Sequence, residues 1–503
     1  MEESAGNEPE DSRPVCLHGI QCKEVGMDHF TSFRHLQTAN EEKARFRAKS
    51  RRRERTDGSS KVDPPSKKAN LHRPAMYVTK VPGISPCFNE PSVAIHIRDI
   101  LHTSMGNLVS SAHFNYMFDI NWLIQQYPVE FRSKPILVIH GEQRSSKSEL
   151  EKECQAYSNI QLIQAPLPFP FGKHHSKMIL LLYDTGMRVV IHTANLIPRD
   201  WELKTQGVWV SPVFPKGDKL SDFQSDLLAY LSAYNRSGLD TWRRHVSSHD
   251  MSDANVHLIA SVPGRHLGQH INTWGHMKLR RILKRNVSVS NEWPAVAQFS
   301  SIGSLGSNPR QWLSGEFCGS LSSSTTSLQM TETELCLIFP SVMNVRRSLE
   351  GYMAGGSLPY HSKTAEKQTY LKRFLHQWRA DCMGRSRASP HIKTYTRLSP
   401  DGKRIAWFLL TSANLSKAAW GALEKKSSQL AIRSYEIGVL FLPKTRSEGF
   451  VIGRVGEKCD DVSSDEFPVP FDVPLVPYEE GDEPWVWDRA YLARDSHNQV
   501  WTP

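Results

Sequence analysis

Short apolar runs alternate with amphipathic segments along the chain from about residue 76 onward. The run "KPILVIHG" (134–141) has the composition of a buried strand, and the flanking "NWLIQQYPVEF" and "SSKSELEKECQAY" have helical spacing. The stretch "MILLLYDTGMRVVIHTAN" holds two apolar runs around a D-T-G turn, which predicts a hairpin or two adjacent strands. Alternating strands and helices predict a layered α/β fold.

The same pattern resumes after about residue 263. "TELCLIFP", "RIAWFLLTSAN" and "YEIGVLFLP" predict strands, "QTYLKRFLHQW" (368–378) predicts a helix, and the Ser-rich "GSLSSSTTS" (319–327) predicts a loop. We therefore expect two similar halves, 81–262 and 263–503. No sequence repeat is visible between them beyond the motif described below.

The segment before these halves has a different composition. Residues 36 to about 75 are charged, contain few large apolar side chains and end in Pro and Ser, which predicts a flexible linker, assigned to 37–80. Its "RRRER" and "KK" clusters are compatible with a nuclear import signal, a nucleic-acid-binding tether or a merely solvated linker.

Composition narrows the class of protein. A chain of 503 residues can hold two or three domains, and its net charge of +10 fits either a solvated surface or a polyanionic partner such as nucleic acid. No apolar run reaches the roughly 18 residues of a membrane span, and the acidic first residues do not resemble a signal peptide. The eight cysteines form no C-x-x-C pair, so we expect a reduced, intracellular protein without a membrane partner.

The tripeptide H-x-K occurs more often than composition would give by chance. Two copies are each followed by an apolar run that ends in a small-residue stretch plus asparagine, at Asn195 and Asn414. The other two lack that context, and we expect their histidines, His276 and His361, on the surface. The four copies are His175-Ser-Lys177, His276-Met-Lys278, His361-Ser-Lys363 and His391-Ile-Lys393.

The repeated His, Lys and Asn suit the chemistry of a phosphodiester. Residues i and i+2 of an extended chain face the same side, so each H-x-K presents an imidazole beside an ammonium. Lys and Asn donors can neutralise phosphoryl oxygens, while an imidazole can attack phosphorus or carry a proton. Two sets supply a nucleophile on one side and a proton donor on the other, without a metal.

These motifs resemble those of the phospholipase D superfamily, in which H-x-K occurs twice and an Asn follows each copy. The family's usual Asp five residues after the Lys is replaced here by Leu182 and Leu398. That departure, together with "HHSKM", "VVIHTANL", "KTQGVW", "PHIKTY", "TSANLSKAAWGALE" and "RSYEIGVLF", resembles the tyrosyl-DNA phosphodiesterase branch over about residues 80 to 503. The resemblance implies two halves, each a mixed sheet flanked by helices, related by a pseudo-two-fold axis with the site between them.

The resemblance also implies roles for individual residues. His175 would be the nucleophile that forms a phosphohistidine with the DNA 3′ end, and His391 would protonate the leaving tyrosyl oxygen and then activate water. Two further residues, Gln206 and Glu436, would bind the histidine Nδ1 atoms in place of the missing Asp, and which histidine each one orients stays open. The expected phosphate ligands are Lys177, Lys393, Asn195 and Asn414.

Contacts to DNA are expected beside this set. "QFSSIGSLG" offers hydroxyl groups and flexible glycines for a backbone phosphate, although it could be an ordinary turn. By resemblance, Ser300, Ser301 and Ser416 contact DNA. Phe171 would stack on a base of single-stranded DNA, although its place next to a strand fits the core equally well.

The amino-terminal segment holds a candidate zinc site. Two thiols and two imidazoles could form a closed tetrahedral site whose metal supplies the folding energy, or they could be dispersed along a disordered tail. The spacing resembles that of a poly(ADP-ribose)-binding zinc finger (1–36), except that a basic residue, Lys23, follows the second cysteine at once. The candidate ligands are Cys16, Cys22, His29 and His35.

Taken together, the motifs predict a nuclear, monomeric DNA-repair hydrolase. It would act without a catalytic cofactor on the 3′-phosphotyrosyl bond left by a stalled type IB topoisomerase, and its finger would bind poly(ADP-ribose). Two alternatives remain open: a lipid phosphodiesterase of the same superfamily, and a non-catalytic protein that binds nucleic acid or poly(ADP-ribose).

Overall fold

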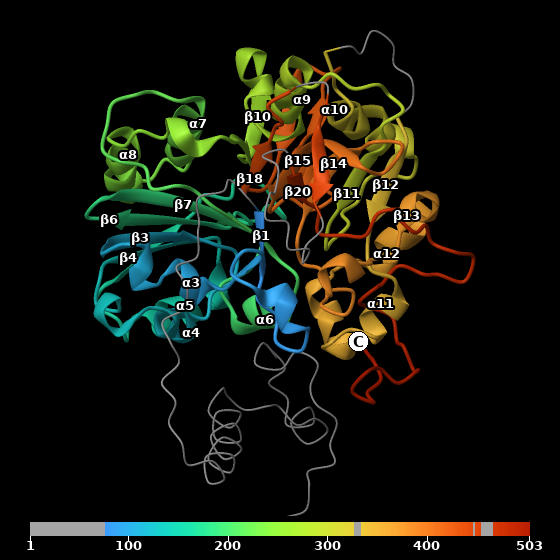
Figure 1. Cartoon of the computed structure of the whole chain (residues 1–503), viewed down its shortest axis with the longest axis horizontal. Helices are drawn as coiled ribbons and strands as arrows, with labels where there is room; N and C mark the ends of the chain where they lie inside the picture. The colour runs from blue at the N-terminus through green and yellow to red at the C-terminus, as the bar shows by residue number, and fades with distance from the viewer. Residues whose placement is uncertain (1–75, 326–332, 446–447, 454–465) are drawn as a thin grey trace, which may run out of the picture. The chain divides into compact units, whose positions relative to one another are not determined.

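The computed structural model describes residues 76–325, 333–445, 448–453 and 466–503. The expected zinc ligands Cys16, Cys22, His29 and His35, and residues 37–75 of the expected linker, lie outside the described residues. Apart from Pro503, the described residues belong to one unit spanning 68–502. Within it, two large mixed sheets are covered by helices, so the expected α/β fold is confirmed (Figure 1).

The first sheet has eight strands. Its three strands at one edge, β3, β4 and β5, run parallel, whereas β3, β6, β7 and β8 are joined by antiparallel pairs. In spatial order the strands are β2 (Ala94–Ile95), β1 (Met76–Thr79), β8 (Gly207–Val210), β7 (Gly186–His192), β6 (Met178–Tyr183), β3 (Leu108–Phe114), β4 (Ile136–His140) and β5 (Ile160–Gln164).

The centre of this sheet follows from its apolar sequence. "MILLLY" is apolar on both faces, and β6 is accordingly a central strand with both faces covered. The predicted hairpin is confirmed: β6 and β7 pair antiparallel from Met178↔Ile191 to Tyr183↔Gly186. Gly186 has φ 153°, and a Cβ there would lie 2.4 Å from the carbonyl oxygen of Phe214, so the close approach at this turn requires glycine.

Helices cover both faces of the first sheet. The face toward α3 to α6 packs Leu123, Leu150 and Trp201 against Ile179 and other apolar strand residues. The helix α4 begins at the capping residue Asp119, whose carboxylate accepts from the backbone N–H of Trp122. The helices of this half are α3 (Ile97–Ile100), α4 (Ile120–Gln126), α5 (Arg144–Cys154), α6 (Pro198–Glu202), α7 (Asp222–Ala233) and α8 (Asp240–Ser247).

The second sheet repeats the order of pairings of the first. Its strands β11, β12 and β13 are parallel, and β11, β14, β15 and β18 follow by antiparallel pairs, as β3, β6, β7 and β8 do. The strands are β13 (Leu375–His376), β12 (Leu335–Ile338), β11 (Ala295–Gln298), β14 (Thr394–Leu398), β15 (Arg404–Thr411), β18 (Glu436–Phe441) and β9 (His257–Ser261). In addition, β19 (Phe450–Gly453) pairs with β15, and β20 (Glu466–Pro468) pairs with β19.

Smaller elements complete the second half. A separate three-stranded sheet is formed by β10 (Gly264–Leu267), β17 (Gln429–Ile432) and β16 (Ala422–Glu424). The helices are α9 (Gly275–Asn286), α10 (Cys318–Leu321), α11 (Val342–Arg346), α12 (Ser362–Ala365) and α13 (Lys417–Trp420). None of the helices in the described part of the chain combines the length and the apolar character that crossing a bilayer requires.

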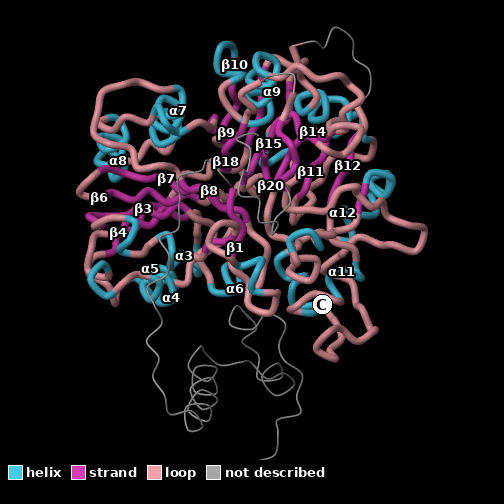
Figure 2. The backbone as a smooth tube through the Cα atoms, viewed as in Figure 1, coloured by secondary structure: helices cyan, strands magenta, loops and turns pink. Residues whose placement is uncertain are grey.

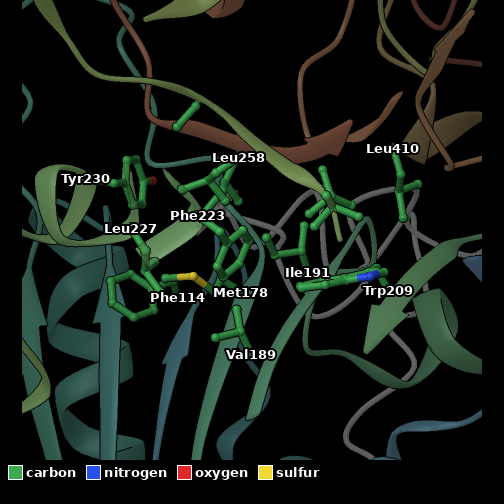
Figure 3. Close-up of a cluster of buried hydrophobic side chains, with 14 of the residues drawn as sticks. Phe114, Met178, Val189, Ile191, Trp209, Phe223, Leu227, Tyr230, Leu258 and Leu410 are labelled. Carbon is green, nitrogen blue, oxygen red and sulfur yellow. The ribbon is translucent and has the colours of Figure 1, made fainter. Parts of the chain in front are cut away.

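One apolar core joins the two sheets. Met178 and Ile191 of the first sheet belong to the same cluster of buried side chains as Leu258 and Leu410 of the second, and α7 contributes Phe223 to it (Figure 3). The ribbon and tube views place the two sheets next to each other with α7 and α8 above the first (Figures 1 and 2). Because the core is continuous, the facing strand ends of the two halves are held in a fixed relation.

Three local predictions need correction. Residues 366–374 form a 3₁₀ helix rather than an α-helix, and the chain then enters β13 at Leu375. The segment 319–327 was predicted as a loop, but α10 occupies its first residues. Finally, β1 starts at Met76, so the end of the segment 37–80 is a buried strand.

The sequence context of His276 predicts a surface residue, and this prediction is wrong. His276 lies on the buried face of α9, in line with Leu279 and Leu283, and is fully buried. Its Nδ1 lies 2.8 Å from Ser320 Oγ and its Nε2 lies 2.9 Å from Glu316 Oε1, so both ring nitrogens have partners. These hydrogen bonds are what make burial of a polar ring tolerable.

Candidate active site

The two H-x-K segments meet across the two halves. Each is extended and lies immediately before a central strand, β6 or β14. The backbone N–H of His175 donates to the carbonyl of Tyr435 at 3.0 Å, and that of His391 donates to the carbonyl of Thr205 at 2.9 Å. Each histidine segment is therefore bonded to the opposite half, next to the residue that receives its side chain.

The first histidine is held by a carboxylate. His175 Nδ1 lies 2.9 Å from Glu436 Oε2, and the same oxygen accepts from Ser412 Oγ at 2.5 Å. The side chains of His175 and Glu436 are 12% and 6% exposed. With Nδ1–H donating to the ionised carboxylate, Nε2 is the nitrogen that presents a lone pair to a ligand.

The second histidine is held by an amide. His391 Nδ1 lies 3.1 Å from Gln206 Oε1, and that oxygen also accepts from Thr193 Oγ1 at 2.8 Å. A carboxylate lies behind this pair, with Asp200 Oδ2 3.5 Å from His391 Nδ1. The question of which residue orients which histidine is thus answered by contacts that cross between the halves in both directions.

Both lysines are buried beside these histidines. Lys177 Nζ donates to the carbonyl of His175 at 3.0 Å, and Lys393 Nζ donates to the carbonyl of His391. Burial lowers the pKa of Lys177 to about 7, and burial together with the charge of Lys177 lowers the pKa of Lys393 well below its usual value. Two buried ammonium groups in one site favour an anionic ligand between them.

The electrostatics of the histidines and carboxylates follow from the same burial. Burial and the neighbouring lysines lower the pKa of both His175 and His391 well below 6.5, which favours the neutral form of each ring while no anion lies between the lysines. Burial raises the pKa of Glu436 to about 7 and raises the pKa of Asp200. Shifted pKa values of several groups in one place are typical of a reaction centre.

The two asparagines are fixed in different ways. Asn414 Oδ1 accepts from the backbone N–H of Ser300 at 3.1 Å and from Ser300 Oγ at 3.2 Å. Its Nδ2 is therefore the group left to donate to a ligand. The backbone N–H of Asn195 donates to Asp200 Oδ2 at 2.7 Å, and its buried Oδ1 has no hydrogen-bond partner. An unpaired amide end in this position points to a polar ligand.

The residues expected to contact DNA differ in their exposure and in their hydrogen-bond partners. Ser300 is 1% exposed and positions Asn414, while Ser301 Oγ donates to the carbonyl of Pro359 at 2.8 Å. Ser416 is the N-cap of α13. Phe171 is 89% exposed with φ 61°, so it is a surface residue and not part of the core.

Phe171 stands at the rim of a small cavity of about 300 Å³. Phe169 and Arg433 also line it, and Arg265 lies over the Phe169 ring at 5.1 Å from its centroid. An exposed aromatic ring beside arginine side chains is typical of surfaces that stack nucleobases.

Sequence reasoning missed several members of the site. Tyr116 places its ring 5.4 Å from that of His175, with Lys173 and Lys177 over it, and no motif marked it. Thr193 and Ser412 carried a signal, since a hydroxyl residue stands two places before each asparagine. Within the described residues, no group of three or more His, Cys, Asp or Glu side chains is arranged to hold a metal ion.

Comparisons with known proteins agree on one family. A family model described as tyrosyl-DNA phosphodiesterase matches residues 75–479. Tyrosyl-DNA phosphodiesterase 1 of Arabidopsis thaliana is 41% identical over 457 residues, covering 81% of this chain and 73% of the relative. The protein of the same name from Drosophila melanogaster is 39% identical over 438 residues, covering 82% of this chain and 73% of the relative.

Solved structures show the same fold. The crystal structure of the yeast tyrosyl-DNA phosphodiesterase matches 82% of this chain and 99% of its own, with a TM-score of 0.63. At 21% sequence identity, this similarity shows a shared mixed α/β architecture.

Proposed function

The chain belongs to the tyrosyl-DNA phosphodiesterase family, and from that premise we propose that it hydrolyses 3′-phosphotyrosyl bonds through a covalent phosphohistidine. It is a phosphodiesterase that cleaves tyrosyl–DNA bonds in DNA repair. The substrate proposed is the peptide-linked DNA end left by stalled topoisomerase I, with other 3′-blocked ends as further substrates. The observation that carries the mechanism is the crossed pairing of two H-x-K segments with Glu436 and Gln206.

The first step uses His175 as the nucleophile. Its neutral ring attacks phosphorus through Nε2, the P–O bond to tyrosine breaks, and a proton from His391 Nε2 goes to the tyrosyl oxygen. The ring becomes a cationic phosphoimidazolium, which the Glu436 carboxylate stabilises through Nδ1–H. The lysine and asparagine donors balance charge on the phosphoryl oxygens.

The second step reverses the proton flow. Water attacks phosphorus, His391 takes a proton from it, the P–N bond breaks, and His175 leaves as the neutral imidazole. The product is a DNA 3′-phosphate, and His391 is again protonated for the next turnover. Gln206 and Thr193 keep Nδ1–H of His391 in place, so Nε2 carries the proton in both steps.

Recognition of DNA and recruitment complete the proposal. Phe171 would stack on a base of single-stranded DNA, with Ser301 and Ser416 near the phosphate and Ser300 acting through Asn414. The halves would be related by a pseudo-two-fold axis, which the repeated order of strand pairings supports. The protein would act as a monomer without a catalytic metal.

The amino-terminal part of the proposal rests on sequence. A zinc finger with ligands Cys16, Cys22, His29 and His35 would bind poly(ADP-ribose), and the basic segment 37–80 would support location in the nucleus. The cysteine and histidine spacing supports this hypothesis. Zinc content of the full chain, compared with that of the Cys16→Ser variant, tests it.

The experiment that tests the mechanism uses a single-stranded oligonucleotide with a 3′-phosphotyrosine, in the presence of EDTA. We expect His175→Ala to abolish release of the 3′-phosphate, and His391→Ala to accumulate a slowly resolving protein–DNA adduct. His361→Ala is the matched control, because it alters an exposed H-x-K copy outside the site. Release that needs neither His175 nor His391 would overturn the two-histidine mechanism.

The open alternatives have less support. In a lipid phosphodiesterase of the superfamily, the motif positions would carry Asp, whereas Leu182 and Leu398 pack against the apolar core here. A protein that only binds nucleic acid has no need of both His-Lys-Asn sets, and both are assembled in one site.

A further inference from the structure

We propose that Asp200 is the counter-ion of His391, a positioning residue that holds this imidazole in its protonated form for the departure of the tyrosyl oxygen. This inference rests on the two-histidine mechanism proposed above. The geometry that carries it is the 3.5 Å separation between Asp200 Oδ2 and His391 Nδ1. Their side chains are 1% and 7% exposed, so water screens this pair only weakly.

The carboxylate is fixed in place by its own half. Asp200 lies in the first turn of α6, and its Oδ2 accepts the backbone N–H of Asn195 at 2.7 Å. Asn195 is one of the asparagines of the site, so Asp200 stands between a phosphate ligand and a catalytic histidine. A carboxylate held by a backbone hydrogen bond keeps its distance from the ring without the entropy loss of a flexible contact.

The two histidines differ in the charge of their direct partners. His175 has the Glu436 carboxylate on Nδ1, whereas His391 has the neutral Gln206 amide. Yet the proposed reaction requires His391, and not His175, to begin as an imidazolium. Because Gln206 is neutral, the negative charge that stabilises the imidazolium of His391 has to come from another residue.

The other charges around His391 oppose its protonation. Lys393, Lys177, His175 and Lys204 all disfavour the charged ring. Lys204 is itself neutralised by Glu350, with Nζ 2.5 Å from Oε2. Among the described residues, Asp200 is the carboxylate that lies within ion-pair distance of His391.

The first step depends directly on the proton that Asp200 helps His391 to hold. His391 gives its Nε2 proton to the tyrosyl oxygen as the P–O bond breaks and becomes neutral, while Asp200 stays ionised throughout. In the second step His391 begins neutral and accepts a proton from water. Because the ring becomes cationic again when it accepts that proton, loss of the Asp200 charge should slow adduct hydrolysis as well as cleavage of the tyrosyl bond.

The test is Asp200→Asn, which removes the charge and keeps an acceptor for the Asn195 N–H. Single-turnover rates are compared for a 3′-phosphotyrosyl oligonucleotide and for the same oligonucleotide with a 3′-(4-nitrophenyl) phosphodiester. The nitrophenolate leaves without a proton. We expect the tyrosyl rate to fall about tenfold or more and the nitrophenyl rate to stay within about twofold, because a nearby charge moves a pKa by roughly 1 to 3 units.

The pH profile gives a second readout. Without the carboxylate, His391 loses its proton at lower pH, so the high-pH limb of tyrosyl cleavage should shift down by about one unit or more. Because the first step is slowed along with the second, the protein–DNA adduct should accumulate less than in His391→Ala. Asp184→Asn, which changes an exposed carboxylate at the β6–β7 turn, is the matched control and should leave both rates unchanged.

A double variant distinguishes loss of the negative charge in Asp200→Asn from damage to the fold. Adding Gln206→Glu to Asp200→Asn places a carboxylate directly on His391 Nδ1, as Glu436 is placed on His175, and should restore tyrosyl cleavage. Equal loss on both substrates, no loss on either, or no recovery in the double variant would overturn the proposal. Failure of the underlying mechanism is recognised separately, because His175→Ala would then retain cleavage of both substrates.

Discussion

Glu436 offers the sharpest test of how the nucleophile is supported. Its Oε2 accepts from His175 Nδ1 at 2.9 Å and from Ser412 Oγ at 2.5 Å, and its side chain is 6% exposed. Glu436→Gln keeps the shape and an acceptor but removes the charge that stabilises the phosphoimidazolium. A hydrogen bond to a charged group contributes about 1.5–3 kcal/mol and a neutral one about 0.5–1.5 kcal/mol.

The difference sets the expected rate. A loss of about 1–2 kcal/mol in the transition state corresponds to a roughly five- to thirtyfold slower first step. Glu436→Ala also leaves the buried donors of His175 and Ser412 without an acceptor, so we expect a further loss of about tenfold or more. Single-turnover release from a 3′-phosphotyrosyl oligonucleotide measures both variants.

The pH dependence provides an independent check. Because burial raises the pKa of Glu436 to about 7, the wild-type first step should lose rate as pH falls through 7 and the carboxylate takes up a proton. Glu436→Gln carries no such group and should lack this low-pH limb. A Gln variant within twofold of wild type, or one as slow as the Ala variant, would refute the argument that charge and acceptor contribute separately.

Three further predictions concern the surroundings of the site. Thr193→Val removes the donor that holds Gln206 Oε1, so adduct resolution through His391 should slow about three- to tenfold in single-turnover assays, and an unchanged rate would contradict this role. Phe171→Ala should weaken binding of single-stranded DNA by about 1–3 kcal/mol in titrations while leaving the melting temperature unchanged, because the ring is 89% exposed; unaltered affinity would count against stacking. Glu350→Gln breaks buried contacts to Lys204 and Arg199 and should lower the free energy of unfolding by about 3–5 kcal/mol in urea titrations. The contacts with Lys204 and Arg199 outweigh burial and lower the pKa of Glu350, so its contribution should be present above pH 4.5 and be lost on acidification, and a difference that persists at low pH would contradict it.

The strands were the part of the fold most open to sequence reasoning. The hairpin of β6 and β7 is marked by unbroken apolar runs and a turn that requires Gly186. Residues 366–374 have helical apolar spacing but form a 3₁₀ helix, because the buried Gln368 turns inward and donates to the Gly303 carbonyl, and its φ of −135° interrupts the helix. Tertiary hydrogen bonds of this kind leave no periodic signal.

In the site, too, the residues that are close in sequence were predictable and those paired with distant residues were not. His175, Lys177 and Asn195 are visible as a motif because they are close in sequence and repeated. Asp200 was missed because its partner His391 is distant in the chain, and His276 was misplaced because burial of a histidine depends on partners such as Glu316. Contacts between distant residues are set by packing, which a single sequence does not display.

The exchange of histidine segments between the halves has a consequence for how the chain could be divided. The first half carries His175 and the residue that binds the ring of His391, Gln206, and the second half carries His391 and the residue that binds the ring of His175, Glu436. The backbone N–H groups of both histidines also donate to carbonyl groups of the opposite half. If the chain were cut between the two sheets, each piece would hold one histidine without the residue that binds its Nδ1 atom. Reassembly of the pieces would restore both histidine pairs together, so recovered turnover would serve as a direct gauge of fragment complementation.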